Sequence, residues 1–470
     1  MSSFDVDAVI VGSGPNGLVA AVTLAEAGWR VVVVEAQETA GGGLRSAETT
    51  LPGFRHDLCA SNHPMAMASP AFRALRLEDE GLTFAQSDVP LGHAIRPGES
   101  GILRRDVDET ASGFGDDERL WRSVMGTFGA RWRQLGRAIG DPLRPTPDLI
   151  ALGATSVWPL PWILRALRDE RSRGVLAGLA AHSIVDLRRP AAALVGVALG
   201  ALAHGVGWPA AVGGTQSIAD ALLARLASLG GELVTGTRVT SIDDLPSARA
   251  VLLDTSPRDA LRIAGHRFTP SYANALHRMR YGAAVYKVDW ALDAPVPWAD
   301  PALTEAGFIH LGGTAEQVIR AERDVTAGQM PDEPFLLLSQ ASTVDPSRAP
   351  AGKYAFSGYA HVPFGYDGDL TDTIERRIEA FAPGFRERIL ARHASGPAEL
   401  EAHNANLIGG AIDGGVPDLR QLIARPRLSL TPQATPDPRI FLCSASTVPG
   451  PGVHGMPGRL AAQAALRRLG

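Results

Sequence analysis

The residues with the clearest chemical meaning stand near the start of the chain. Residues 12–17 read Gly-Ser-Gly-Pro-Asn-Gly after an apolar run, and Glu35 ends a run of β-branched residues. Gly12, Gly14 and Gly17 would allow a turn with positive φ, the close approach of a pyrophosphate, and tight packing of a helix on a strand. Free N–H groups at the helix start would bind the phosphates, and the Glu35 carboxylate would accept hydrogen bonds from ribose. The spacing predicts a dinucleotide site.

A second glycine-rich segment follows at once. Residues 41–46 read Gly-Gly-Gly-Leu-Arg-Ser. Flexible glycines let the backbone lie against a flat or anionic ligand, and Arg45 could pair with a pyrophosphate that a helix dipole only partly neutralises. Alone, the segment is typical of a surface loop. Directly after the first motif, it indicates an extension of the same site.

The elements that must position these residues recur later in the chain. Further candidates are strands at 232–235, 237–242, 251–255 and 439–443, a helix ending at 229, and a closing helix at 459–469. Three separated segments therefore carry features of one α/β unit. We expect a Rossmann-type domain, discontinuous in sequence, built from residues 1–75, 213–256 and 412–470.

The rest of the chain, residues 76–212 and 257–411, is expected to form an inserted domain of mixed sheet plus helices. Its helical patterns cover 118–139 and 163–181, and its strand candidates are 284–292, 335–340 and 354–359. A chain of 470 residues is too long for one compact core, which agrees with two domains.

Composition excludes several classes of function. The net charge of −5 makes nucleic acid a poor partner, and two cysteines are too few for a disulfide framework, so we expect a reducing, cytoplasmic compartment. Twelve histidines without metal-ligand spacing predict no metal site. The sequence contains neither His-Glu-x-x-His nor Gly-x-Ser-x-Gly, the signatures of two large hydrolase groups.

Taken together, the motifs resemble the phytoene-desaturase-like branch of the flavin amine oxidase superfamily. The stretches that carry the likeness are GSGPNGL, GGGLRS, GWPAAVGG and FLCSASTVPGPGVHGMPG, with Gly409-Gly410, Gln421-Leu422 and Arg425-Pro426. The sequence departs from the family where Gly43 replaces a frequent Arg, where Cys59 and Ser444 replace Gly, and where Val448 replaces His. The inserted domain shows the weakest likeness, so the family's substrates do not transfer.

The resemblance implies that the cofactor is FAD and that the inserted domain binds substrate. The first glycine motif and Glu35 would hold the adenosine half, Gly42 and Arg45 the pyrophosphate, and the Val239 backbone the adenine. The loop that begins at Gly452 would border the flavin ring. The cofactor-binding residues implied are Gly12, Gly14, Gly17, Glu35, Gly42, Arg45, Val239, Gly452, Val453 and Met456.

Three side chains carry alternative interpretations. His454 is the candidate catalytic residue, because its loop should border the flavin, although a structural hydrogen-bonding role is equally open. Lys287 could be the counterpart of the lysine that amine oxidases place near the flavin, but a solvated strand face is the preferred interpretation. Cys59 could attach the flavin covalently, but a buried, small apolar residue is the commoner case.

The function favoured at this stage is an FAD-dependent dehydrogenase or desaturase that takes a hydride from a lipophilic or extended organic substrate. Since only one nucleotide motif was found, oxygen, a quinone or another diffusible acceptor would reoxidise the flavin. The alternatives are a flavin amine oxidase, a flavin-dependent isomerase, and a binding protein without flavin like the Rab GDP-dissociation inhibitors.

Two apolar stretches bear on membranes. Residues 191–212 are long enough to span a bilayer, but their Ala and Gly content favours a buried helix. Residues 157–164, Val-Trp-Pro-Leu-Pro-Trp-Ile-Leu, are followed by Arg165 and Arg168. This second stretch could enter a headgroup layer, although the wall of a substrate pocket is the preferred interpretation. A peripheral membrane contact therefore stays open.

Overall fold

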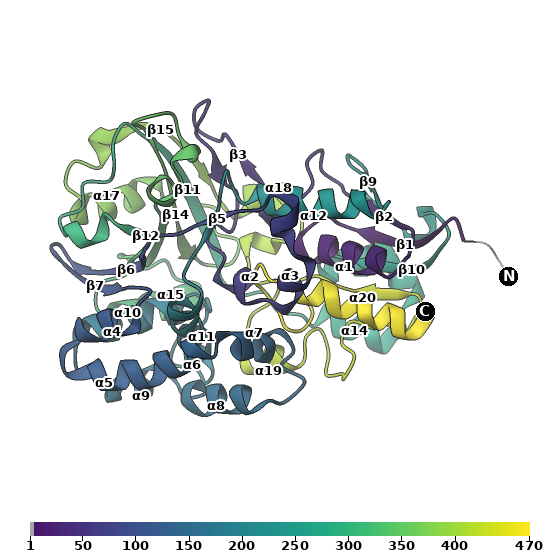
Figure 1. The fold of residues 1–470 in the computed structure, drawn as a ribbon, viewed down its shortest axis with the longest axis horizontal. Helices are drawn as coiled ribbons and strands as arrows, with labels where there is room; N and C mark the ends of the chain where they lie inside the picture. Colours follow the sequence, from purple (N-terminus) through teal and green to yellow (C-terminus); the bar gives the residue numbers. More distant parts are fainter. Residues whose placement is uncertain (1–3) are drawn as a thin grey trace.

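The computed structural model describes residues 4–470 and contains two sheets and a helical layer (Figure 1). The parallel sheet with its helices lies on one side of the molecule and ends near both chain termini. The mixed sheet lies on the opposite side, and most helices between residues 107 and 205 pack beneath it. The expected fold class, α/β with an inserted domain of mixed sheet plus helices, is confirmed.

The parallel sheet draws its strands from three separated parts of the chain. Its order is β16-β10-β1-β2-β9, and every neighbouring pair is parallel. The strands are β1 (Val6–Val11), β2 (Val31–Val34), β9 (Glu232–Val234), β10 (Ala248–Leu253) and β16 (Ile440–Leu442). The central strands are apolar on both faces because helices cover both, as is usual for parallel sheets.

Helices from distant segments cover this sheet. On one face pack α1 (Pro15–Glu26), α12 (Gln216–Ser228) and α20 (Met456–Leu469), and on the other α13 (Pro257–Ala264) and α14 (Pro270–His277). Helix α1 begins at Pro15, whose fixed φ suits a first helical turn, and its Ala, Leu and Val side chains are buried. The domain boundaries stay a prediction, but α13 and α14, assigned from sequence to the inserted domain, lie against the parallel sheet.

The mixed sheet has the order β15-β11-β14-β13-β12-β6-β7. Its strands are β6 (Val89–Arg96), β7 (Glu99–Leu103), β11 (Ala284–Leu292), β12 (Ala306–Leu311), β13 (Leu336–Ser339), β14 (Tyr354–Val362) and β15 (Ile389–Ser395). Helix α17 (Thr371–Phe381) shares a core with one face, and α10 (Glu170–Ala181), α11 (Ala192–Gly205) and α15 (Ala315–Thr326) share a core with the other.

The remaining helices are short. They are α2 (Pro64–Ala68), α3 (Pro70–Leu75), α4 (Val107–Ser112), α5 (Glu118–Trp121), α6 (Thr127–Ala130), α7 (Trp132–Gly140), α8 (Pro147–Ser156), α9 (Leu160–Ile163), α16 (Ala341–Val344), α18 (Pro397–His403) and α19 (Leu419–Ile423). Two small antiparallel strand pairs, β3 (Ser46–Ala47) with β4 (His56–Asp57) and β5 (Phe84–Ala85) with β8 (Ala210–Ala211), complete the fold.

One expectation from the sequence is corrected and one is confirmed. The strand expected at 237–242 is irregular chain that leads into a 3₁₀ turn at Ile242–Asp244, because its backbone forms no hydrogen-bond ladder with a neighbouring strand. The apolar segment 191–212 is the buried helix α11 followed by a loop and β8, in line with the preferred interpretation. Among residues 4–470, no single helix is long and apolar enough to cross a membrane, and only one bent pair of helices passes such a test jointly.

Candidate functional site

The first glycine motif forms the turn between β1 and α1. Gly12 has φ +98°, a conformation that side chains rarely adopt, and a Cβ atom on Gly17 would lie 2.2 Å from the Gly12 carbonyl oxygen. Both positions therefore require glycine. The turn delivers the N-terminus of α1, where the Gly17 N–H is bonded to the Asp254 carboxylate, to the carboxyl edge of the parallel sheet, where ligands bind in open α/β sheets.

Glu35 fastens this turn from the end of β2. One carboxylate oxygen, Oε2, accepts hydrogen bonds from the Ser13 N–H at 2.9 Å and the Ser13 Oγ at 2.6 Å, and the other, Oε1, accepts from the Gln37 N–H at 2.9 Å. A carboxylate has about four acceptor positions, so capacity for ribose hydroxyls remains. The Thr237 N–H donates to the Glu35 carbonyl at 2.8 Å, which brings the segment leading to Val239 beside Glu35.

Two helices begin side by side at this edge. A Cβ atom on Gly458 of α20 would lie 1.9 Å from the Asn16 carbonyl oxygen of α1, and one on Gly455 would meet the Val19 side chain at 2.5 Å. The glycines thus allow the first turns of α20 and α1 to touch. The positive ends of both helix dipoles converge, which suits an anionic ligand. The loop containing Gly452 and Val453 leads directly into α20, whose first residue is Met456.

Arg45 lies buried at the junction between the glycine turn and α18. Its Nε donates to the Gly42 carbonyl at 3.1 Å and its Nη2 to the His403 carbonyl at 2.6 Å. Burial lowers the pKa of the guanidinium, and the Glu35 charge opposes that shift. A buried guanidinium bonded to Gly42, which lies against Gly14 at the start of α1, adds positive charge where a pyrophosphate would need it.

A buried acid, Asp254, stands among these groups and was not singled out from the sequence. Its Oδ2 accepts from the Gly17 N–H at 2.9 Å, and a Cβ atom on Gly14 would lie 2.6 Å from the same oxygen. Burial raises the pKa of Asp254 to about 7, with backbone hydrogen bonds opposing the shift and the Glu35 charge adding to it. The one signal in the sequence was an acid at the carboxyl end of a strand candidate.

His454 makes structural hydrogen bonds within its own loop. Its Nδ1 accepts from the Met456 N–H at 3.2 Å, its Nε2 lies 3.2 Å from the Pro451 carbonyl oxygen, and its own carbonyl accepts from Ser69 Oγ at 2.5 Å. Burial lowers the pKa of His454 to about 4, so the imidazole is neutral at physiological pH. It borders a small, mostly apolar cavity lined by Met65, Ala68, Ser69, Gly136, Ile139, Gly140, Leu202, His454 and Met456.

Lys287 is not on a solvated strand face, so that interpretation was wrong. Its side chain is buried on β11, and its Nζ contacts the Asp289 carboxylate, which also accepts from Thr49 Oγ1 at 3.1 Å. Cys59 lies close enough for the Lys287 charge to act on it, but burial dominates and raises the pKa of the thiol. The thiol is therefore protonated and a poor nucleophile, which favours its apolar role.

The mixed sheet collects histidines that are far apart in sequence. Lys287, Tyr359, Leu337, His310 and His93 stand opposite one another on successive strands. His182 Nε2 lies 2.9 Å from His310 Nε2, and His361 Nδ1 lies 2.8 Å from Glu322 Oε1. Burial lowers the pKa of His93 to about 4 and that of His182 to about 3. No group of three metal-binding side chains among residues 4–470 could hold an ion.

The donors at the parallel sheet fit a dinucleotide such as FAD. Two helix N-termini and Arg45 offer positive charge to a pyrophosphate, and Glu35 offers acceptors to a ribose. Comparison with known proteins agrees with this geometry. Residues 10–76 match the model of the NAD(P)-binding Rossmann-like domain.

Among curated relatives, the chain is 25% identical over 551 residues to the rat pyridine nucleotide-disulfide oxidoreductase domain-containing protein 2 (Rattus norvegicus), covering 99% of this chain and 94% of that protein. It is 25% identical over 435 residues to a phytoene dehydrogenase of Streptomyces griseus, covering 86% and 80%. Among solved structures, cyclohexylamine oxidase from Brevibacterium oxydans superimposes with a TM-score of 0.60 at 16% identity, covering 99% of both chains. The fold is that of the flavin-type oxidoreductases.

Proposed function

We propose that this chain is an FAD-dependent dehydrogenase or desaturase that removes a hydride from a C–H bond of a lipophilic or extended organic molecule. The proposal is supported by the apolar residues beside the loop expected to border the flavin, which enclose a cavity that as it stands is too small to hold a substrate. Met65, Ile139, Leu202 and Met456 contribute thioether and hydrocarbon surface to its wall. An apolar wall at that place suits a substrate that offers a C–H bond and few polar groups.

Bound FAD would supply a hydride acceptor at N5 of its ring. The protein's part is to hold cofactor and substrate in register and to exclude water. Glu35 and Arg45 would fix the cofactor at its ribose and pyrophosphate, while the α20 loop would border the ring. His454 stays neutral and hydrogen-bonded to its own loop, so it shapes this loop and is not available as a charged acid.

The electrons are expected to leave to oxygen, a quinone or another diffusible acceptor. Another glycine pair, Gly312-Gly313, lies between β12 and α15. The N-terminus of α15 is occupied by protein groups. Thr314 and Gln317 form a reciprocal cap, and the Ala315 N–H donates to Glu170 Oε1 at 3.1 Å. The glycine pair also lacks the third glycine of the first motif, so it is not a second nucleotide motif, and NAD(P)H should reduce the flavin slowly or not at all.

Anaerobic bleaching of the flavin tests the reaction class. The reconstituted chain is mixed with phytoene, cyclohexylamine, NADH and NADPH in separate stopped-flow runs. Rapid, saturable bleaching by the hydrocarbon, with none by the pyridine nucleotides, supports the proposal. Rapid bleaching by NADH or NADPH would move the protein to the reductases.

An amine oxidase is the second candidate, because Lys287 is buried in the strand where the resemblance places the amine oxidase lysine. Saturable bleaching by cyclohexylamine but not by phytoene favours this candidate. Lys287→Met should then slow reduction by the amine, whereas the control Lys353→Met, at a partly exposed lysine, should not. Conversion of a polyene isomer without net bleaching would instead indicate an isomerase.

A further inference from the structure

The helix pair α8–α9 presents large apolar side chains to solvent. Trp158 and Trp162 are 52% and 56% exposed, and their rings stack with centroids 5.9 Å apart and an interplanar angle of 14°. Ile150 on α8 is 65% exposed. The interpretation of residues 157–164 as a pocket wall is therefore wrong for both tryptophans. Two exposed, stacked indoles on one short segment are unusual for a surface that meets only water.

The exposed residues are not needed to pack the helix pair on the protein. Leu152, Leu160 and Leu164 already fill its inner side and belong to the core of the helical layer. The two helices meet at an angle of 84°, and the tryptophans stand at this bend, before α9 and within it. The pair is thus apolar on both its inner and its outer side, which a single contact with the core does not explain.

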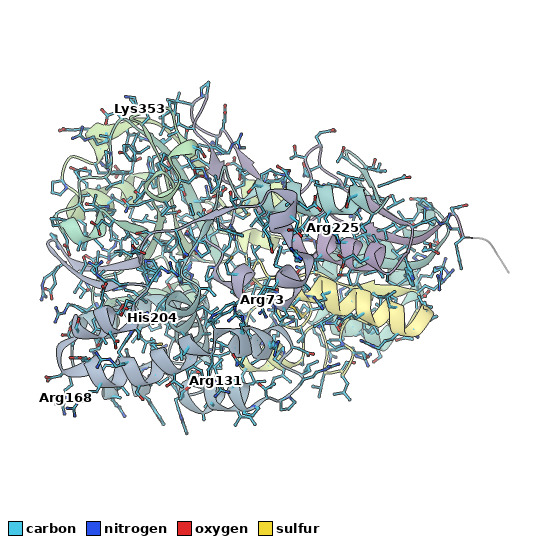
Figure 2. The ribbon with its side chains drawn as sticks, in the orientation of Figure 1. Arg73, Arg131, Arg168, His204, Arg225 and Lys353 are labelled. Atoms are coloured by element: carbon cyan, nitrogen blue, oxygen red, sulfur yellow. The ribbon has the colours of Figure 1, made fainter. Side chains whose placement is uncertain are left out.

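The segment around the pair carries positive charge although the chain as a whole is acidic. Residues 131–168 hold six arginines and two aspartates, a formal charge of +4, whereas the whole chain has −5. Both aspartates are neutralised, Asp148 by Arg131 at 3.0 Å and Asp141 by Arg144 at 3.1 Å. Four further arginines, at 133, 137, 165 and 168, are exposed, and one of them, Arg168, pairs with Asp116 at 4.0 Å. Figure 2 shows Arg168 at the same outer edge that α9 occupies in Figure 1.

We propose that the α8–α9 surface, made of Ile150, Trp158, Trp162, Arg165 and Arg168, docks on a bilayer that contains anionic lipid. Indole rings suit the boundary between headgroups and acyl chains, and arginines around them attract anionic headgroups. A second copy of the chain fits less well, because it would bring these arginines against each other. The docking is peripheral and requires no spanning helix.

The position of the surface relates it to the cavity beside His454. Helix α7 packs against α8 and also lines that cavity through Gly136, Ile139 and Gly140. If the proposed function holds, a lipophilic substrate dissolved in the membrane would enter through this helical layer. The docking itself does not depend on the reaction and is tested without it.

Vesicle binding by the full chain is the test. The protein is sedimented with phosphatidylcholine vesicles, with or without phosphatidylglycerol, at low and high salt. We expect binding to the anionic vesicles that weakens with salt, as for screened charges. Trp158→Ser with Trp162→Ser should lower the partition constant by roughly tenfold or more. Arg165→Gln with Arg168→Gln should lower it by roughly fivefold per charge and reduce the salt dependence.

Leu390→Ser is the matched control. Leu390 is 48% exposed on β15, at the edge of the molecule opposite α8 and α9 in Figure 1, so its change should leave vesicle binding as in the wild type. Melting temperatures check that all variants are folded. Three results would overturn the proposal: wild-type protein that ignores anionic vesicles at low salt, a double tryptophan variant that binds like wild type, or a dimer that the tryptophan changes dissociate in sedimentation velocity.

Discussion

The candidate nucleotide site and the histidine cluster of the mixed sheet are assembled in different ways. At the parallel sheet, the glycine turn and Glu35 lie within one short stretch of sequence, and Glu35 hydrogen-bonds to Ser13 directly. In the mixed sheet, His93, His182, His310 and His361 come from strands and a helix that are separated by dozens of residues. A contiguous motif can be found in a sequence, whereas a cluster formed by tertiary contacts cannot.

The two regions share one property, which is buried polar atoms without a hydrogen-bond partner. In and around the mixed sheet these atoms are His93 Nδ1, His310 Nδ1, Glu322 Oε2 and Trp208 Nε1. Beside the glycine motifs they are Asn16 Oδ1 and His403 Nε2, although both oxygens of Glu35 accept hydrogen bonds. Both regions therefore hold polar atoms with unused capacity, as buried polar networks at functional sites often do.

The largest expected effect comes from breaking the junction between the two regions. Arg348 is fully buried and pairs with Asp57 beside the glycine-rich segment and with Asp345 beside the mixed sheet, at 3.0 Å each. Arg348→Met leaves two buried carboxylates unpaired, so the free energy of unfolding should fall by about 3–5 kcal/mol in a urea titration. The exposed pair of Arg376 with Asp372 is the control. Arg376→Met should change the free energy of unfolding by less than about 1 kcal/mol. Similar losses for both variants would contradict this account.

Glu35→Ala should weaken the binding of FAD. The change removes charge-assisted hydrogen bonds of about 1.5–3 kcal/mol and should weaken FAD binding by roughly 10- to 100-fold in a calorimetric titration. Arg45→Ala should weaken it comparably. The exposed Glu38→Ala, three residues further along, should bind FAD like the wild type. Unchanged affinity in Glu35→Ala would remove Glu35 from the site.

Acid should destabilise the protein through the histidine cluster of the mixed sheet. The pKa of His182 falls to about 3 in the folded protein from an ordinary value of 6.5, so the unfolded chain binds a proton that the folded chain rejects. Stability is then full above pH 6.5 and is lost as the pH falls toward 3, by roughly 1.4 kcal/mol per pH unit for each such histidine. His182→Gln should reduce the loss of unfolding free energy between pH 6.5 and 5 by roughly 1.4 kcal/mol per pH unit. An unchanged slope would mean that His182 is accessible to water.

Asp254→Asn should give the smallest effect, in the opposite pH direction. The pKa of Asp254 rises to about 7 from an ordinary 3.8, so the folded protein retains a proton that the unfolded chain loses. The stabilisation is complete below about pH 4 and is lost as the pH rises through 7. Ionised Asp254 also repels a pyrophosphate, so wild-type FAD affinity should fall a few-fold between pH 6 and 8, whereas Asp254→Asn should show a flat profile. If FAD affinity still fell steeply with pH in Asp254→Asn, another group would be responsible for the titration.

Much of the fold was predictable because it follows local pattern. The strand at 284–292 is predicted at its observed bounds, since a short run rich in Val, Tyr and Trp between Gly282 and Pro295 favours a strand. Helix α20 was predicted from the glycine loop that precedes it, although it begins three residues earlier, at Met456. The segment 237–242 has the composition of a strand, but no neighbouring strand offers it hydrogen bonds.

The rest depended on tertiary contacts. Asp254 gains its importance from Gly17, which is 237 residues away in the sequence. The exposure of Trp158 and Trp162 follows from the bend between α8 and α9, while alternating leucines on the same segment are buried. Periodicity shows that a segment is apolar, but it does not show which apolar side chains find a partner.

The absorbance spectrum of the purified chain tests the central claim most directly. If Glu35, Arg45 and the two helix N-termini form an FAD site, the protein should be yellow as purified or become so with added FAD, and the flavin released on denaturation should amount to one FAD per chain. A folded protein that stays colourless in excess FAD would contradict the account and leave a Rossmann-type protein that binds a different nucleotide or none.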